Sequence, residues 1–157
     1  MLRCLCFIGI LFAAGSLFYS CQYPCGRASS SIGLISFTDT ESDIIILRRF
    51  SKSTNFTDLQ DTFTISRNNS NFQREHDTLL ILHGMEDGNN DITSSYDYEI
   101  FLPKISRLYR LSDIVEDIKY GSKLGPKIYC INPIISYKLN GQPVDVVNYY
   151  SFIYLKK

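Results

Sequence analysis

Tryptophan is absent from this chain, and only two of its 157 residues are histidines. His76 and His83 lack the spacing of a paired zinc motif such as His-Glu-x-x-His. The sequence also has no Gly-x-Ser-x-Gly nucleophile motif and no glycine-rich phosphate loop. Because the familiar catalytic motifs are missing, we expect a protein that is not an enzyme and that has no cofactor.

A net charge is missing as well, since 16 basic residues balance 16 acidic ones. A neutral domain has no electrostatic reason to bind nucleic acid, so we expect no nucleic-acid partner. The longest apolar run, residues 5–14, is shorter than the roughly 20 residues of a membrane-spanning helix.

The first 20 residues have the pattern of a secretory signal peptide. Arg3 supplies a basic start, residues 5–14 form the apolar segment, and Ser20 stands before Cys21. A small residue before a cysteine resembles a lipobox, so we expect a lipoprotein signal over residues 1–20 and acylation (palmitate) of Cys21. Its acyl chains would give a lasting membrane anchor. A cut after Ala13-Ala14-Gly15, which would release a secreted protein, is the alternative.

The remaining cysteines are few. Cys4 and Cys6 leave with the signal, which leaves Cys25 and Cys130 in an oxidising compartment. These two are candidates for a disulfide, and the alternative is a free Cys25 with a buried, apolar Cys130. A disulfide requires the two Cα atoms to lie within about 7 Å of each other, a distance that the sequence does not show.

The rest of the chain is rich in aromatics, with 11 tyrosines and 10 phenylalanines, which favour strands. After a flexible tether over residues 21–31, short apolar segments alternate with polar turns at roughly ten-residue spacing. We expect one β domain over residues 32–157, an antiparallel β-sandwich of the immunoglobulin-like or transthyretin-like kind. A small β-barrel is the alternative. The expected strands are residues 32–38, 44–50, 62–66, 78–83, 96–102, 108–111, 127–131, 134–139, 142–147 and 149–155.

Two segments make more specific local predictions. Asn140-Gly141 lies between apolar alternations and predicts a two-residue hairpin turn, with Pro143 making the returning arm an edge strand or a short strand. Residues 112–121 fit either one short helix or a continued strand, since Ser112 could cap a helix and Gly121 could end it. The polar segment 67–77 is expected to be a loop.

Arg48 and Arg49 are neighbours in an expected strand, so their side chains should point to opposite faces. The start of this strand, residues 44–46, is apolar enough to be buried on both faces. We expect one of the two arginines to be exposed at a sheet edge, and we do not expect an anion site.

The strongest metal candidate is a loop with oxygen ligands at alternate positions, Asp87, Asn89 and Asp91. A calcium loop also needs glycine at its sixth position and glutamate at its twelfth, where this chain has Ile92 and Tyr98. We therefore expect a solvated loop without a bound metal.

Several segments resemble those of small lipoproteins of Bacteroidota cell envelopes. They are Ser20-Cys21, the serine-rich tether, Tyr98 to Pro103 (YEIFLP) and Cys130 to Tyr137 (CINPIISY). The resemblance implies an outer-membrane lipid anchor and a sandwich domain, and it brings no assigned active site. The acidic run that often follows the cysteine in surface-exported members is absent, so the side of the membrane stays open.

These observations favour a lipid-anchored, non-enzymatic binding or accessory module of the cell envelope, whose partner is a protein or a glycan. A secreted hydrolase that uses loop carboxylates is one alternative. A carbohydrate-binding module is another, and it would need two or three aromatic rings on one flat face.

Overall fold

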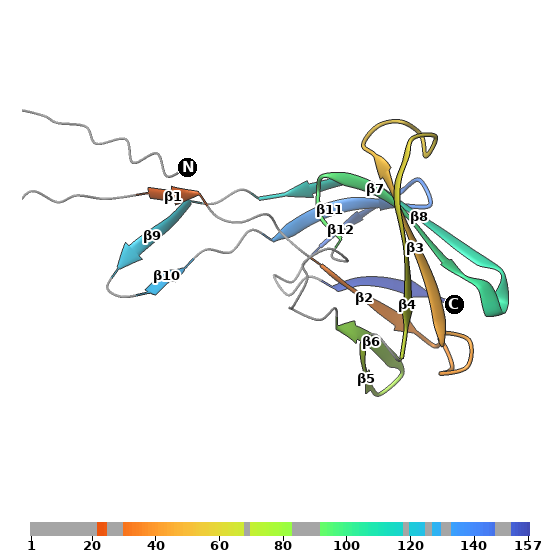
Figure 1. The fold of residues 1–157 in the computed structure, drawn as a ribbon. Helices are drawn as coiled ribbons and strands as arrows, with labels where there is room; N and C mark the ends of the chain where they lie inside the picture. Colours follow the sequence, from red (N-terminus) through yellow and green to blue (C-terminus); the bar gives the residue numbers. More distant parts are fainter. Residues whose placement is uncertain are drawn as a thin grey trace, which may run out of the picture.

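The computed structural model describes residues 22–24, 30–67, 70–82, 92–117, 120–124, 127–129, 133–146 and 152–157. Nearly all regular structure in these ranges is β, apart from one turn of 3-10 helix at Pro103–Ile105. Two sheets made mainly of antiparallel strands face each other (Figure 1). The predicted all-β sandwich is confirmed.

The larger sheet has six strands in the order β12-β11-β8-β7-β3-β4, and every neighbouring pair is antiparallel. Its strands are β3 (Ile44–Ser51), β4 (Leu59–Ser66), β7 (Tyr96–Leu102), β8 (Arg107–Glu116), β11 (Ile134–Leu139) and β12 (Gln142–Asp145).

The smaller sheet has four strands in the order β13-β2-β6-β5. Its strands are β2 (Ser31–Ile35), β5 (Asn71–Glu75), β6 (Thr78–Leu82) and β13 (Phe152–Lys156). Only one neighbouring pair of this sheet is parallel, β13 with β2. Within the described residues each sheet keeps two edge strands, so the barrel alternative is not met.

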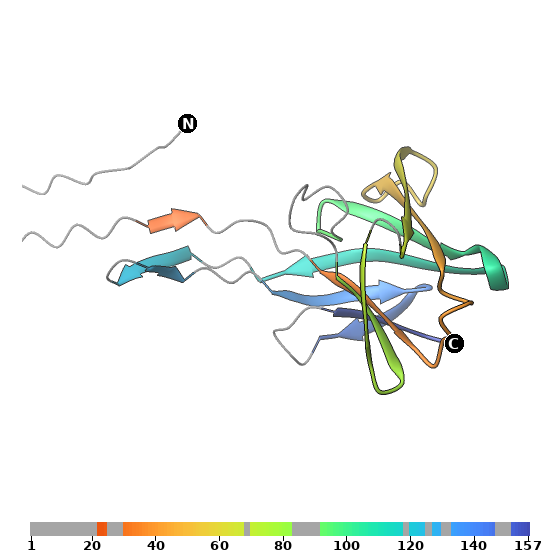
Figure 2. The same ribbon diagram turned by 60° about the horizontal axis from the view of Figure 1, so that its bottom comes forward.

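A third, small sheet lies beside the sandwich (Figures 1 and 2). It pairs β9 (Tyr120–Leu124) with β10 (Lys127–Tyr129) and with β1 (Gln22–Pro24), which falls in the expected tether.

The helix alternative for residues 112–121 is wrong, because strands β8 and β9 occupy the described part of this segment. Asp113 has a φ of 51°, a left-handed value, beside an irregularity in the pairing of β8 with β11. Its carboxylate forms an ion pair with Lys138 of the neighbouring strand at 2.8 Å. Pairing with β11 thus outweighs the local helix signals.

The core lies between the two sheets and follows the alternation of the strands. Ile45 and Leu47 of β3 face Ile32 and Leu34 of β2, and all four are fully buried. Each such side chain contributes about 1.5–3 kcal/mol relative to an exposed one. The expected burial of residues 44–46 on both faces is wrong, since only the middle residue is buried.

The predicted hairpin turn is confirmed between β11 and β12. Asn140 and Gly141 both have positive φ, 51° and 80°, and Leu139 pairs directly with Gln142. The predicted edge position of Pro143 is also confirmed, because β12 ends the larger sheet.

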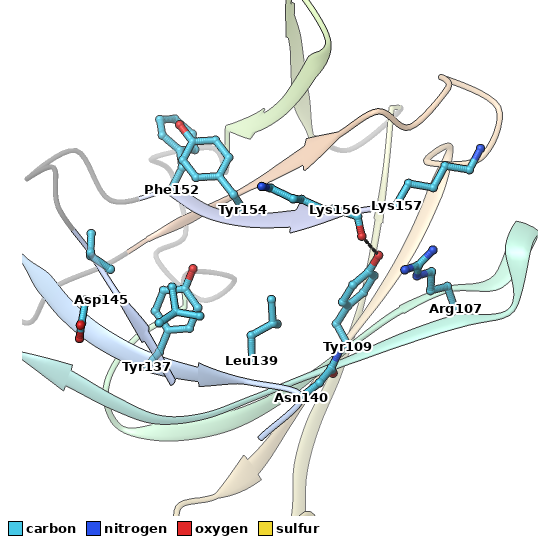
Figure 3. A pocket seen from close by; sticks show the side chains of 12 residues that line it. Arg107, Tyr109, Tyr137, Leu139, Asn140, Asp145, Phe152, Tyr154, Lys156 and Lys157 are labelled. Atoms are coloured by element: carbon cyan, nitrogen blue, oxygen red, sulfur yellow. Dashed lines mark hydrogen bonds between the residues drawn. The ribbon is translucent and has the colours of Figure 1, made fainter. Parts of the chain in front are cut away.

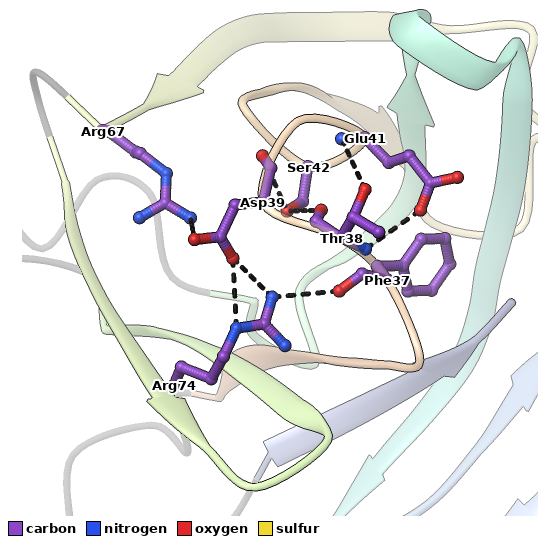
Figure 4. Close-up of polar contacts among 7 residues, drawn as sticks. All are labelled: Phe37, Thr38, Asp39, Glu41, Ser42, Arg67 and Arg74. Atoms are coloured by element: carbon purple, nitrogen blue, oxygen red, sulfur yellow. Dashed lines mark hydrogen bonds and ion pairs between the residues drawn. The ribbon is translucent and has the colours of Figure 1, made fainter.

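The turn between β2 and β3 ties the sheets together (Figure 4). Thr38 and Glu41 hydrogen bond reciprocally: the Thr38 amide donates to the Glu41 carboxylate, and the Glu41 amide donates to the Thr38 hydroxyl. Asp39 then accepts Arg67, just after β4, at 3.1 Å and Arg74, on β5, at 2.5 Å. One carboxylate therefore joins basic residues carried by the two sheets.

Candidate functional site

A groove opens on the side of the sandwich where both sheets end, between edge strand β13 and strands β11 and β12 (Figure 3). Its volume is about 600 Å³, within the size range of small-molecule sites. The lining residues are Arg107, Tyr109, Tyr137, Leu139, Asn140, Val144, Asp145, Val146, Phe152, Tyr154, Lys156 and Lys157.

Two tyrosine hydroxyls from the larger sheet hold the free edge of β13. Tyr109 on β8 donates to the Lys156 carbonyl at 2.5 Å, and the Tyr137 hydroxyl on β11 hydrogen bonds with the backbone of Tyr154. Burial raises the pKa of both hydroxyls, because removal from water disfavours the charged phenolate. These bonds replace ladder partners that an edge strand lacks, which fixes one wall of the groove.

Strand β13 divides its side chains between core and groove. Ile153 and Leu155 are buried in the core, whereas Phe152, Tyr154 and Lys156 alternate with them and line the groove (Figure 3).

Tyr154 forms an exposed aromatic surface because of its neighbour in the sheet. It pairs with Gly33 of β2, and a Cβ added to this glycine would lie 2.7 Å from the tyrosine Cδ1. The ring therefore occupies the space that a larger residue would fill, and 44% of Tyr154 remains exposed. The Phe152 ring lies beside it, with centroids 6.1 Å apart and an angle of 40° between the planes. Two rings thus share one side of β13.

Two cations at the groove have no carboxylate partner among the described residues. Within the described part of the chain no carboxylate lies within 4 Å of the Lys156 ammonium or of the Arg107 guanidinium. The Arg107 guanidinium lies 5.4 Å from the centre of the Tyr109 ring. The third cation, Lys157, is neutralised by Glu41 at 2.7 Å.

The acidic group of the lining lies at the other end of the groove. The Asp145 side chain extends from β12, and its carboxylate points away from Lys156 and Arg107 (Figure 3). One half of the groove is therefore positive, whereas the other is apolar with an acidic margin.

Two other arginines of the larger sheet, Arg48 and Arg110, are arranged differently, since their charges are matched within the sheet. Glu99, itself buried, accepts Arg48 at 3.2 Å and Arg110 at 3.0 Å across neighbouring strands.

The predicted opposite faces are seen at Arg48 and Arg49, since the Arg48 side chain is 36% exposed whereas Arg49 is buried on the same side of β3 as Leu47. The predicted sheet edge is wrong, because β3 is an interior strand. The Arg49 guanidinium lies 4.5 Å from the centre of the Phe63 ring and 5.4 Å from that of Tyr96, with Asp61 at 3.8 Å. Aromatic contacts thus surround this charge inside the sandwich.

The site residues expected from the sequence lie outside the described part of the structure. They are Cys21, Cys25, Cys130, Asp87, Asn89 and Asp91. Two neighbouring positions are described: Ile92 and Tyr98, which stand where a calcium loop needs glycine and glutamate, are fully buried core residues. His76 lies in the turn between β5 and β6 with a φ of 54°.

Sequence reasoning did not identify the groove. The alternation of Phe152, Tyr154 and Lys156 was readable as one face of a strand, but Tyr109 and Tyr137 come from distant segments. Only the sheet order brings these groups together.

Over the ranges that the structure describes, no three His, Cys, Asp or Glu side chains gather as a metal site requires. In the same ranges no helix is long and apolar enough to cross a membrane. Comparison with models of protein families, with curated protein sequences and with solved structures found no match for this chain, so its function rests on the geometry of the groove.

Proposed function

We propose that this protein is a non-enzymatic carbohydrate-binding module, anchored to the cell envelope through Cys21, and that the groove beside β13 is its binding site. The observation that carries the proposal is the Tyr154 ring, which is supported by Gly33, adjoins Phe152 and is 44% exposed at the groove.

A sugar ring matches this surface chemically. One face of a pyranose carries mainly C–H groups, which pack against the electron-rich face of an aromatic ring. Its hydroxyls need polar partners, and Lys156, Arg107 and Asp145 supply donors and acceptors around the same groove. An apolar surface with a few polar groups at its margin is the usual composition of a ligand site.

The carboxylates of the groove favour binding over hydrolysis. Glycoside hydrolysis commonly uses two carboxyl groups about 5–9.5 Å apart. Among the lining residues Asp145 is the one acidic side chain, and Glu41 is already paired with Lys157. This supports a module that holds a glycan without cleaving it.

The proposed anchor agrees with such a role. A lipid on Cys21, in the outer membrane as the lipoprotein resemblance implies, would hold the groove close to envelope or environmental glycans. Tethering raises the local concentration of a module around nearby ligands, so that modest affinity for each sugar suffices.

Affinity electrophoresis of the full-length, detergent-solubilised protein in gels containing soluble polysaccharides tests the proposal. We expect Tyr154→Ala to weaken binding about tenfold, as the loss of about 1.4 kcal/mol from one aromatic contact implies. Gly33→Ala should also weaken it, because the added methyl group displaces the Tyr154 ring.

Leu59→Ala is the matched control, since Leu59 is an exposed apolar residue of β4, at the opposite edge of its sheet from β12. Its mobility should equal that of the wild type in every gel. The proposal fails if no polysaccharide retards the wild type, or if Tyr154→Ala migrates as the wild type does.

A further inference from the structure

We propose that the groove selects acidic sugars, with the sugar packed on Tyr154 and its carboxylate attracted to the positive half of the groove that Lys156 and Arg107 form. This inference rests on the proposed carbohydrate function and names the chemical class of its ligand.

The spacing along β13 carries the first step. Tyr154 and Lys156 are two residues apart on the same side of the strand, which places them about 7 Å apart along it. In a uronic acid the carboxylate is attached directly to the pyranose ring. One sugar unit can therefore cover the Tyr154 ring and reach the next outward side chain with its carboxylate. Figure 3 shows the Lys156 ammonium extending along β13 toward the Tyr154 ring.

The second argument is the difference in ion pairing between the cations of the groove and the other arginines. Arg48, Arg67, Arg74 and Arg110 each have a carboxylate at 3.2 Å or closer, whereas Arg107 and Lys156 have none within 4 Å in the described ranges. A guanidinium offers a planar pair of N–H donors that matches a carboxylate, and an ammonium adds a point charge.

The asymmetry of the groove carries the third step. Asp145 lies at the end away from Lys156 and Arg107 (Figure 3), so it repels an anion from that end. An acidic sugar is thus favoured in one orientation, with its carboxylate toward the positive half.

Acidic polymers and their uncharged esters distinguish selection of acidic sugars from carbohydrate binding in general. Polygalacturonate, alginate and hyaluronan would each be compared with their carboxyl-methyl-esterified forms, which keep the sugar rings and lose the charge. For the polymer bound most tightly, we expect esterification to weaken binding at least tenfold, and raised salt to weaken only the acidic form. Dextran sulfate is the control for general attraction of polyanions and should bind more weakly than that polymer.

Variants assign the effect to residues. Lys156→Gln and Arg107→Gln should each weaken binding of the acidic polymer severalfold and leave binding of its ester unchanged. The Lys156 substitution keeps the backbone carbonyl that Tyr109 binds, so the wall of the groove is retained. Lys104→Gln is the control, because Lys104 is an exposed cation of the 3-10 turn that does not line the groove, and it should change little.

The two proposals fail differently. If Tyr154→Ala weakens both forms while Lys156→Gln and Arg107→Gln change neither, the carbohydrate site stands and selection of acidic sugars is wrong. Equal binding of the acidic and esterified polymers, or stronger binding of dextran sulfate, would also overturn the selection. If none of these polymers binds, selection of acidic sugars is wrong, and the gels with neutral polysaccharides then decide whether the carbohydrate site stands.

Discussion

At the scale of residues, ion pairs and hydrogen bonds of single side chains determine how closely the two sheets approach at each side of the sandwich. Asp39 clamps Arg67 and Arg74 near β4 and β5, which are edge strands of the two sheets. On the side of β12 and β13, the described contacts include tyrosine hydroxyls that reach the edge of β13. Because the tyrosine hydroxyls reach β13 across the length of a ring, β13 stays farther from β8 and β11 than the spacing of about 5 Å between paired strands. The groove follows from this spacing.

The ion pair of Glu41 predicts that the stability of the fold depends on pH. Hydrogen bonds from the Lys157 ammonium and from the Thr38 amide lower the pKa of Glu41 from 4.5 to about 2. Because the folded state lowers the pKa, the contribution is present above pH 4.5 and is lost as the pH falls toward 2. We expect the thermal midpoint to fall across this window, and expect Glu41→Gln to reduce the dependence. Thermal melts followed by circular dichroism between pH 6 and pH 2 measure it.

Glu75→Gln is the control for this experiment, because Glu75 is an exposed glutamate whose carboxylate accepts a hydrogen bond from Gln73 of its own strand β5. Its melts should retain the pH dependence of the wild type. A Glu41→Gln protein with the same slope as the wild type would show that this carboxylate does not stabilise the turn between β2 and β3.

At the scale of elements, the β11–β12 hairpin depends on two residues with positive φ. A Cβ at Gly141 would meet nothing within 4 Å, so the cost of substitution comes from the backbone alone. We expect Gly141→Val to lower the free energy of unfolding by about 1–3 kcal/mol, because a β-branched residue is strained at this φ. Urea denaturation measures the change.

Gly141→Asn is the matched variant, since asparagine tolerates the left-handed region far better than valine. It should lose much less stability than Gly141→Val. Equal midpoints for Gly141→Val and the wild type would mean that the positive φ at this position does not matter to stability.

The pairing of β13 with β2 is the element that shapes the groove. Residues 152–156 run parallel to residues 31–35, so the two segments that pair stand near opposite ends of the sequence. Such a contact closes a very long loop before it contributes stability, which slows folding. The rings of Phe152 and Tyr154 take their places only after this pairing has formed.

At the scale of the whole molecule, the proposed anchor makes a prediction about location. Ser20-Cys21 follows an apolar signal, so Cys21→Ala should move the protein from the membrane fraction to the soluble fraction. Loss of two or more acyl chains removes the attachment, whereas the β domain is unchanged. Fractionation of cells and labelling with palmitate measure the effect.

Cys25→Ala is the control here, because Cys25 is also near the start of the chain but does not follow a small residue. It should stay with the membrane and incorporate label. A wild type that takes up no palmitate, together with a Cys21→Ala variant that still sediments with membranes, would rule out the lipid anchor.

Local features of the sequence determined the β class, the turn at Asn140-Gly141 and the edge position of Pro143. Each depends on a residue's own backbone preference or on alternation within a few positions, so it needs no knowledge of distant partners. Residues 71–75 escaped the same reasoning: they form edge strand β5, whose mostly exposed polar side chains show no apolar alternation.

Tertiary structure alone decided which strands are neighbours, and with that the candidate site. Arg49 is buried because its side of β3 faces the inside of the sandwich, where it lies against Phe63 and Tyr96. Tyr154 is supported because β13 pairs with β2 and its Gly33. Pairing of this kind is set by burial and hydrogen bonding between segments far apart in the chain. No single residue shows which distant segment it will pair with. The class of fold could therefore be predicted from the sequence, whereas the groove depends on the packing of strands in three dimensions.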